Sequence, residues 1–395
     1  MFVKQHGVKV RIYPNHDQQD AIEQNIGNVR FLWNAFLGMA NERYQNNPTL
    51  PTLGKYDYNN LLSTMKNEHN FPFLKASEST SLQIVSDNLH NAFKQFFLKK
   101  RGYPNFKSKH RTTPSSTMRN TNGNTELERA TIKLPKIGWM PARWSSNTEI
   151  GNIKRVTITR QPTGEYIASL IVESESQTFN KTGEVIGLDM GQTDLMIGSN
   201  GYIVRTKHYK NYEAKLVSWQ RKAARRGRLA KNKGIPLSDA KNYQWAKQMV
   251  AKYHAKIRNC RNDSLHKETT QLVKDYDVIA IEDLAVKQIM NISTSEMTVA
   301  GKRKNNHAIA NQSWYTIATM LAYKCEWYGK VFVKVAPHFT TQDCSDCGHR
   351  TGPKNDVSVR EWTCLHCFAH HNRDVNAAQN ILQRGLDELK TPVVA

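Results

Sequence analysis

Four of the six cysteines of this 395-residue chain stand in two Cys-x-x-Cys pairs. Sixteen residues separate the pairs, a spacing typical of a structural zinc ribbon, in which two tight knuckles offer four thiolates to one ion. Unliganded thiols or a redox pair are the alternative, although four exposed thiols would invite oxidation. Neighbouring histidines leave open whether an imidazole replaces one thiolate. The expected ligands are Cys344, Cys347, Cys364 and Cys367, and the histidines beside them are His349, His366, His370 and His371.

Three carboxylates stand where elements of structure can bring them together. Asp189 ends the apolar run 185–188, and Glu282 ends the apolar run 278–281. Asp374 stands in the first turn of an expected helix. Acids at the ends of buried strands lie at the rim of a sheet, and two Mg²⁺ ions held there about 4 Å apart would activate a water for phosphodiester cleavage. Each acid alone has an ordinary alternative, as a turn cap or a helix N-terminal charge.

The positive charge is concentrated in two segments. The chain has 56 Lys and Arg against 34 Asp and Glu, a net charge of +22. Residues 205–267 hold 18 cations and three acids, a net +15, and residues 94–111 hold seven cations and no acid. Unmixed blocks of charge repel themselves unless a polyanion neutralises them, which favours a nucleic acid partner over a merely solubilising surface.

Candidate nucleic-acid contacts in these segments combine cations with aromatic rings. Tyr103 and Phe106 are interleaved with lysines, an arrangement that suits base stacking beside phosphate contacts, although such rings also serve as core. Gln83, within residues 51–125, is a further candidate contact. The candidate contacts are Gln83, Lys99, Lys100, Arg101, Tyr103, Lys107, Lys109, Arg221, Arg225, Arg226, Arg258 and Arg261.

The composition excludes several classes of protein. With 39% hydrophobic and 23% charged residues, the chain is globular, not disordered or fibrous. No apolar run reaches 18 residues and no charged-then-apolar leader follows Met1, which disfavours membrane spanning and secretion. The two remaining cysteines, Cys260 and Cys325, fall on expected helices and are interpreted as core residues. The sequence therefore indicates a soluble, cytoplasmic protein.

The N-terminal part of the chain reads as strands with helices inserted among them. A short strand over 8–12 precedes expected helices over 17–44 and 81–100, whose apolar residues recur at helical spacing. Residues 112–130 are rich in Ser, Thr and Asn and are expected to form a loop. Residues 131–176 read mainly as strands.

The C-terminal part supplies the elements that position the three acids. Short buried-type strands are expected over 185–188, 278–281 and 331–335, together with a helix over 314–328. Two long basic helices lie between the first two strands, and Ser238 is the expected N-cap of the second. Its expected packing stripe is Trp245, Met249, Tyr253 and Ile257.

Three segments resemble the split motifs of a RuvC-type, RNase H-like nuclease: Ile186–Gly191 (IGLDMG), Ile281–Leu284 (IEDL) and Asn372–Asn380 (NRDVNAAQN). The expected ribbon lies between the second and third motifs. That order resembles the TnpB (OrfB) family, transposon-encoded RNA-guided nucleases related to type V CRISPR effectors. The resemblance covers nearly the whole chain and includes residues 102–109 (GYPNFKSK) and 341–348 (TQDCSDCG).

The resemblance implies roles for residues already singled out. Asp189, Glu282 and Asp374 would form the catalytic triad and hold Mg²⁺, and the four ribbon cysteines would hold Zn²⁺. Arg360, between the knuckles, would contact the scissile phosphate, with a surface cation as the alternative.

The sequence departs from the family pattern at two positions beside the ribbon. Phe368 stands where Gly commonly follows the last ribbon cysteine, and Asn372 stands where Asp often precedes Arg-Asp. Neither departure removes a ligand, so both concern the local turns and not the chemistry.

The implied fold is an α/β and α+β multidomain protein, with an N-terminal β-barrel wedge carrying a helical insertion and a C-terminal RNase H-like (RuvC) domain carrying the zinc ribbon. The expected domains are 1–180 (wedge, with an insertion of about 15–125), 181–336 (nuclease core, with a basic helical hairpin of about 205–275), 337–371 (ribbon) and 372–395 (last nuclease segment and tail).

The implied function is an RNA-guided DNA endonuclease that cuts target DNA next to a short flanking motif by two-metal chemistry. Its partners would be a guide RNA derived from the transposon end and double-stranded target DNA, with no membrane and no small-molecule substrate. One alternative, a nuclease-inactive RNA-guided DNA-binding regulator, is disfavoured by the intact acids. Another, an RNA-independent transposase or resolvase, would work without a bound RNA.

Overall fold

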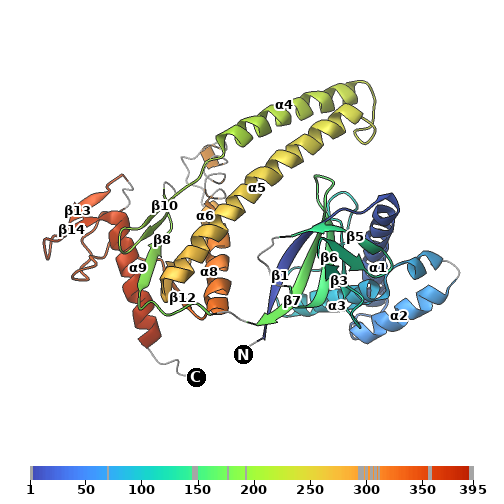
Figure 1. Cartoon of the computed structure of the whole chain (residues 1–395), viewed down its shortest axis with the longest axis horizontal. Coiled ribbons are helices and arrows are strands. Elements are labelled where there is room, and N and C mark those ends of the chain that lie inside the picture. The colour runs from blue at the N-terminus through green and yellow to red at the C-terminus, as the bar shows by residue number, and fades with distance from the viewer. Residues whose placement is uncertain are drawn as a thin grey trace. The chain divides into compact units, whose positions relative to one another are not determined.

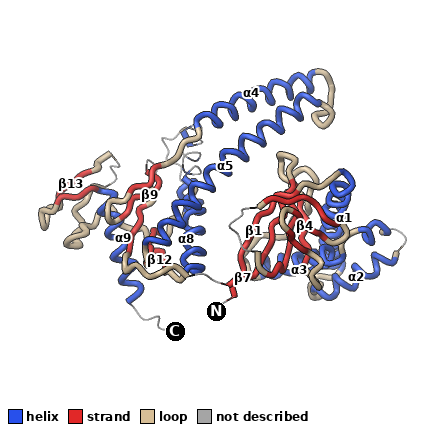
Figure 2. The backbone as a smooth tube through the Cα atoms, in the orientation of Figure 1, coloured by secondary structure: helices blue, strands red, loops and turns tan. Residues whose placement is uncertain are grey.

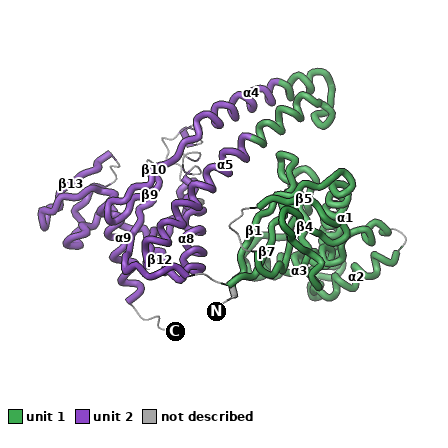
Figure 3. Tube along the Cα trace, viewed as in Figure 1, with its two compact units in different colours: residues 1–175, 226–252 green, residues 176–225, 253–395 purple. Residues whose placement is uncertain are grey.

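The computed structural model describes most of the chain as two compact units. The described residues are 3–68, 71–144, 150–175, 178–191, 194–291, 312–354 and 358–390, together with 298, 301, 302, 306 and 309. Unit 1 comprises residues 1–175 and 226–252, and unit 2 comprises residues 176–225 and 253–395 (Figure 3). The architecture is mixed α/β (Figure 1).

A seven-stranded antiparallel sheet forms the body of unit 1 (Figure 2). Its strand order is β2-β6-β7-β1-β5-β4-β3. Strand β1 pairs along its whole length with β7 but only through Arg11 and Ile12 with β5, so β1 joins the two parts of the sheet. The strands are β1 (Val3–Ile12), β2 (Ser115–Arg119), β3 (Glu126–Glu128), β4 (Thr131–Leu134), β5 (Gly138–Arg143), β6 (Asn152–Arg160) and β7 (Tyr166–Glu175).

Helix α1 (His16–Asn46) links two hydrophobic cores of unit 1. It begins at a capping box formed by Asn15 and Gln18. Its first half packs Ile22 and Ile26 against the sheet. Its second half, including Phe36, packs in a separate helical core with α2 (Lys55–Asn67), the 3-10 helix η1 (Pro72–Ala76) and α3 (Ser79–Phe97).

Unit 1 differs from the sequence prediction at two places. Residues 112–130, expected to form a loop, contain β2 and β3, and helix α2 was not expected. β2 is a polar strand at the edge of the sheet, where the Ser116 hydroxyl accepts from Asn25 Nδ2 (3.2 Å) and the Arg119 N–H donates to the Thr80 hydroxyl (2.9 Å). Hydrogen bonds to residues distant in the sequence therefore hold β2 in place, although its own sequence gives little indication of a strand.

A five-stranded mixed sheet forms the centre of unit 2. Its strand order is β10-β9-β8-β11-β12, with β8, β11 and β12 parallel and with β9 and β10 antiparallel to their neighbours. The strand and helix predictions at 185–188, 278–281, 314–328 and 331–335 are confirmed. The elements are β8 (Val185–Asp189), β9 (Asp194–Gly198), β10 (Ile203–Arg205), β11 (Val278–Glu282), β12 (Val331–Val335), α8 (Trp314–Tyr328) and α9 (Arg373–Lys390).

Helices cover both faces of this sheet. On one face, Ile279 and Ile281 of β11 pack in a core with residues of α8 and of α5 (Lys241–Asp275). On the other face, Ala280 packs with Ile381 of α9. Strand β8 meets α9 at Gly187, where an added Cβ would lie 2.2 Å from the Ala378 carbonyl oxygen. A side chain at Gly187 would therefore push α9 off the sheet.

Helices α4 (Lys210–Asn232) and α5 (Lys241–Asp275) form the basic hairpin (Figure 1). The part of the hairpin within unit 1 is anchored by Gln248, whose Nε2 donates to the Thr163 carbonyl (3.2 Å). Two expectations here are wrong. Helix α5 begins at Lys241 and not after Ser238, because residues 237–239 form a turn. Trp245, expected to pack, is 49% exposed, and its ring meets the Arg226 guanidinium instead.

The remaining elements are α6 (Val286–Asn291), β13 (Glu361–Thr363) and β14 (His370–Asn372). β13 and β14 pair as a two-stranded antiparallel sheet directly before α9. Among the described residues, no helix is both long and apolar enough to cross a membrane.

Candidate active site and metal centre

Two of the three predicted acids lie at the same edge of the unit 2 sheet. Asp189 is the last residue of β8, and Glu282 is the last residue of β11. These strands are parallel neighbours with Leu188 opposite Ile281, so the two acids take adjacent positions where the strands end. Asp374 stands in the first turn of α9, the helix that lies directly on β8.

Glu282 and Asp374 lie close enough to Asp189 to affect its ionisation. Burial, and after it the negative charges of Glu282 and Asp374, raise the pKa of Asp189 to about 7, against the opposing effects of the Met190 backbone N–H and of Arg373. Burial also raises the pKa of Glu282. Carboxylates gathered in this way destabilise one another unless a cation neutralises them. The structure therefore brings together three acids that lie far apart in the sequence.

Asp374 and Glu282 each accept a hydrogen bond from a nearby side chain. Asp374 accepts from Arg360 Nη1, at 2.8 Å to Oδ2 and 3.1 Å to Oδ1. Glu282 Oε1 accepts from the Thr340 hydroxyl at 2.6 Å. Across the described residues, groups of three or more His, Cys, Asp or Glu with ligand atoms within 4.8 Å of one another occur only in the ribbon. The three carboxylates are thus more widely spaced than the ribbon ligands.

The donor set at this edge fits a hard divalent cation. Mg²⁺ prefers carboxylate oxygens and usually takes only one or two of them, keeping waters in its remaining positions. A cation here would also offset the cost of the buried charge at Asp189. Asp189, Glu282 and Asp374 are accordingly the residues that would hold Mg²⁺.

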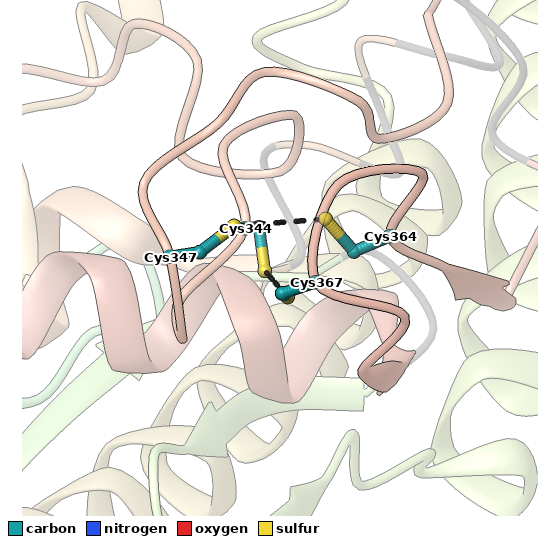
Figure 4. A group of neighbouring side chains, drawn as sticks. All are labelled: Cys344, Cys347, Cys364 and Cys367. Carbon is teal, nitrogen blue, oxygen red and sulfur yellow. Dashed lines mark hydrogen bonds between the residues drawn. The ribbon is translucent and has the colours of Figure 1, made fainter.

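The four predicted zinc ligands form one compact cluster (Figure 4). The Sγ atoms of Cys344 and Cys367 lie 3.6 Å apart, and those of Cys347 and Cys364 lie 3.7 Å apart. A tetrahedral zinc with Zn–S bonds of about 2.3 Å requires edges of about 3.8 Å between sulfur atoms. The cluster therefore fits a structural zinc. Hydrogen bonds from the Cys367 backbone N–H and the Thr351 hydroxyl lower the pKa of Cys364, whereas burial raises the pKa of Cys344.

Three of the four neighbouring histidines lie beside the cluster, whereas His370 contacts Glu361 and Thr363. Nε2 of His371 lies 3.0 Å from Cys344 Sγ, and the His371 ring contacts Trp362. His349 and His366 stack on each other with ring centroids 3.5 Å apart, beside Cys347. Since four thiols already supply a tetrahedral set, the geometry favours the Cys₄ ligand set over a histidine replacement.

The two departures from the family pattern are accommodated differently. Asn372 Oδ1 accepts from the backbone N–H groups of Asp374 and Val375, both at 3.2 Å, so asparagine caps α9. Phe368 takes the left-handed conformation, with φ at 60°, and its side chain is 78% exposed. Its counterpart after the first knuckle, Gly348, has φ at 75°. Phe368 is therefore a non-glycine residue in a glycine conformation.

Replacing Phe368 with glycine is expected to stabilise the zinc-loaded protein. A left-handed non-glycine residue costs about 1–2 kcal/mol, and the greater freedom of glycine in the unfolded chain cancels part of this, leaving a gain of about 0.5–1 kcal/mol. Thermal melting should show a rise of about 2 °C for Phe368→Gly. Phe368→Ala, which removes the ring but keeps Cβ, should show no such rise. Equal rises in melting temperature in both variants would show that backbone strain at Phe368 is not the cause.

Most of the predicted nucleic-acid contacts lie on exposed surface. Gln83 is exposed on α3, and Lys99, Lys100, Arg101, Tyr103 and Lys109 are exposed in the segment after α3. Arg221, Arg225 and Arg258 are exposed on the hairpin, while Arg226 and Arg261 are half-buried.

Lys107 is placed differently from the exposed candidates. Its Nζ lies 3.9 Å from the centroid of the Trp33 ring, and burial lowers its pKa. Its backbone is held at both ends by Asn34, whose Oδ1 accepts from the Lys107 N–H (2.7 Å) and whose Nδ2 donates to its carbonyl (3.0 Å). The structure therefore makes Lys107 part of the packing between this segment and α1.

Sequence reasoning missed the residues that tie the ribbon to α9. Asn376 and Asn380 both donate to the Asp343 carbonyl, at 2.9 Å and 2.7 Å, and Asn380 also donates to the Thr340 carbonyl at 2.8 Å. The only local signal was the spacing of two asparagines four residues apart on an expected helix, which places them on one face.

Comparisons with known proteins match nearly the whole chain. Family models match residues 1–48 (helix-turn-helix domain, HTH_OrfB_IS605), 169–293 ("Probable transposase", OrfB_IS605) and 314–381 (Cas12f1-like, TNB domain). The chain is 31% identical over 385 residues to the "Putative RNA-guided DNA endonuclease InsQ" of Escherichia coli (strain K12), covering 95% of this chain and 91% of the relative.

A second relative and a solved structure are also similar to this chain over most of its length. The "Putative RNA-guided DNA endonuclease" of Streptomyces pristinaespiralis is also 31% identical over 385 residues, covering 96% of this chain and 89% of the relative. The cryo-EM structure of the Cas12f1-sgRNA-target DNA complex contains a chain with TM-score 0.53 and 11% identity, covering 96% of this chain and 98% of that one. At this identity the likeness concerns the fold.

Proposed function

This chain belongs to the OrfB (TnpB) family, and on that premise we propose that it is an RNA-guided DNA endonuclease. It would cut target DNA next to a short flanking motif, with a guide RNA derived from the transposon end. One observation carries the nuclease part of the proposal: Asp189, Glu282 and Asp374, from three separate elements, meet at one edge of a mixed sheet in a chain of net charge +22. The names of the two relatives described above support the RNA guide.

The chemistry assigned to this edge is phosphodiester hydrolysis. Mg²⁺ bound by the carboxylates would supply an activated water and would stabilise the leaving oxygen. The protein itself holds the three carboxylates on rigid elements. Two stand at strand ends and one stands on α9, which packs closely against β8 at Gly187. Arg360 is positioned to compensate charge there, since its guanidinium already binds Asp374. When a cation occupies the carboxylates, Arg360 is free to contact the scissile phosphate.

The exposed cations are assigned to the two nucleic acids. The hairpin arginines would bind phosphates of the guide RNA or of its heteroduplex with DNA, and base pairing would supply the sequence specificity. The segment after α3 offers Tyr103 for stacking beside Lys99, Lys100 and Arg101. Gln83 on α3 is the proposed reader of the flanking motif. The ribbon would guide the DNA strand and would not cut it.

A single experiment tests the proposal. RNA that copurifies with the protein is sequenced, and the complex is then given Mg²⁺ and DNA carrying a matched target beside randomised flanks. Cleavage confined to matched targets with one enriched flanking motif is expected. Binding without cleavage would overturn the nuclease assignment, and cleavage that survives removal of the RNA would overturn the RNA guide.

Neutralising two hairpin arginines is expected to reduce the salt dependence of RNA binding. Each phosphate contact releases counterions, so Arg221→Gln with Arg225→Gln should make the slope of log K against log salt shallower by about 1.4 to 1.8. Filter binding at several salt concentrations measures the slope. The control, Lys75→Gln with Lys181→Gln, removes the same charge from exposed sites outside the two basic segments. Equal slopes in the two double variants would refute a specific role for the hairpin.

A further inference from the structure

Thr340 is a buried polar residue that lies between the candidate active site and the ribbon. Only 3% of its surface is exposed. Its hydroxyl donates to Glu282 Oε1 at 2.6 Å, a short bond of the charge-assisted kind. Within the described part of the chain, this is the hydrogen bond that fixes an oxygen of the Glu282 carboxylate. The Thr340 hydroxyl therefore determines where that carboxylate points.

The segment that carries Thr340 is fastened to α9 by one stripe of side chains. Asn376, Asn380 and Arg384 follow one another at intervals of four residues, which places them on one face of the helix. Asn380 Nδ2 holds the Thr340 carbonyl at 2.8 Å, and Asn376 and Asn380 both hold the Asp343 carbonyl. Arg384 Nη1 donates to the carbonyls of Ala336 (3.2 Å) and His338 (2.6 Å).

The same segment runs directly into the zinc ligands. Asp343 precedes Cys344, and the Ser345 backbone N–H donates to Asn376 Oδ1 at 2.9 Å. Asn376 is only 1% exposed and stands two residues after Asp374 on α9. One hydrogen-bonded network thus joins Glu282, the first zinc knuckle and the helix that carries Asp374.

We infer that Thr340 is a positioning residue, which orients Glu282 for divalent cations and is itself held by α9 and the zinc ribbon. The inference rests on the proposed function, because it gives Glu282 the role of a metal ligand. It assigns the ribbon a task beyond its own folding, since the base of the ribbon fixes one of the proposed catalytic side chains. Outer residues that orient metal ligands typically change metal affinity by about 10- to 100-fold when they are replaced.

The test compares Thr340→Val, which keeps the shape and removes the hydroxyl, with Thr340→Ser, which keeps the hydroxyl. Thr341→Val is the matched control, because the Thr341 side chain makes no hydrogen bond to any described residue. Two quantities are measured: the Mn²⁺ dissociation constant of the zinc-loaded full chain, by electron paramagnetic resonance, and the Mg²⁺ concentration for half-maximal cleavage by the RNA complex. Zinc content is measured in every variant.

Thr340→Val is expected to raise both quantities by about tenfold or more, with Thr340→Ser and Thr341→Val within about twofold of the wild type. Zinc content should stay unchanged. A second variant, Asn380→Asp, removes the donor that holds the Thr340 carbonyl and should raise both quantities while Thr340 and Glu282 are intact. This variant carries the test if Thr340→Val does not fold.

Three results separate the possible failures. Wild-type Mn²⁺ binding in both Thr340→Val and Asn380→Asp would overturn the positioning role. Equal impairment in Thr340→Ser and Thr340→Val would also overturn it, because packing of the methyl group would then be the cause. A wild type that binds Mn²⁺ but cuts no DNA, with Mn²⁺ affinity still weakened in Thr340→Val, would overturn the proposed function and support the positioning role.

Discussion

Replacing Asp189 with asparagine is expected to abolish DNA cleavage and, at the same time, to make the protein more stable at neutral pH. The loss of cleavage follows from the loss of a carboxylate that would bind Mg²⁺. Metal stabilisation of a transition state is worth several kcal/mol, and about 4 kcal/mol corresponds to about a thousandfold in rate. Cleavage by the RNA complex should therefore fall at least a thousandfold, while RNA binding persists because Asp189 lies outside both basic segments.

Stability is expected to rise in this variant although cleavage falls, because the charged carboxylate of Asp189 is costly to bury. The pKa of Asp189 rises from an ordinary 3.8 to about 7, so the folded protein holds a proton that the unfolded chain releases. The stability of the wild type without divalent ions must then fall as pH rises from about 4 to 7 and remain low above that range. Above pH 7 the penalty reaches up to about 4 kcal/mol, and asparagine removes it.

Thermal melting in chelator across pH 4 to 8 measures this difference. The Asp189→Asn variant should melt several degrees above the wild type at pH 8, and the gap should close toward pH 4. Asp283→Asn is the matched control, since this neighbouring acid is 64% exposed and pairs with Lys334. It should keep both cleavage and the wild-type melting profile. Wild-type cleavage by the Asp189→Asn variant would show that Asp189 is not an active-site residue.

The elements that carry the acids could be predicted because buried parallel strands leave a local mark. Residues 185–188 and 278–281 are short, continuous apolar runs, as expected for strands covered by helices on both faces. The acids that end them therefore had to lie at the edge of the sheet. The zinc ligands could also be predicted from the sequence, because the two cysteines of each knuckle stand at a short, fixed spacing along the chain.

The missed features depend on contacts between distant parts of the chain. Thr340 carries no pattern of its own, and its role follows from a hydrogen bond to a residue 58 positions earlier. The polar edge strand β2 is held by Asn25 and Thr80, which no local pattern can reveal. Trp245 fitted a helical packing stripe, but the Arg226 guanidinium gave its ring a surface partner. Periodicity predicts which face of a helix is apolar and does not show what covers that face.

Replacing Cys344 with serine is expected to release the zinc and to disorganise the base of the ribbon. Cys344 is fully buried, and its Sγ lies 3.6 Å from that of Cys367, so serine removes a ligand that no solvent molecule can easily replace. Structural zinc sites contribute about 10–16 kcal/mol of apparent binding free energy, which is folding free energy for a segment this small. Zinc content should fall from one ion per chain to nearly none, and the melting temperature should drop.

The location of the damage makes this prediction specific. Hydrogen exchange should increase through residues 337–371, and the hydrogen bonds of Asn376 and Asn380 to Asp343 should be lost with the knuckle that positions it. Because the same segment holds Thr340 against Glu282, cleavage should fall although all three acids remain. Cys260→Ser is the control and should keep zinc, stability and cleavage, because Cys260, which was expected in the core, is only partly buried on α5. A Cys344→Ser protein with undiminished zinc would show that the ion is held by another ligand set, and one that loses zinc but cuts DNA normally would separate the ribbon from the active site.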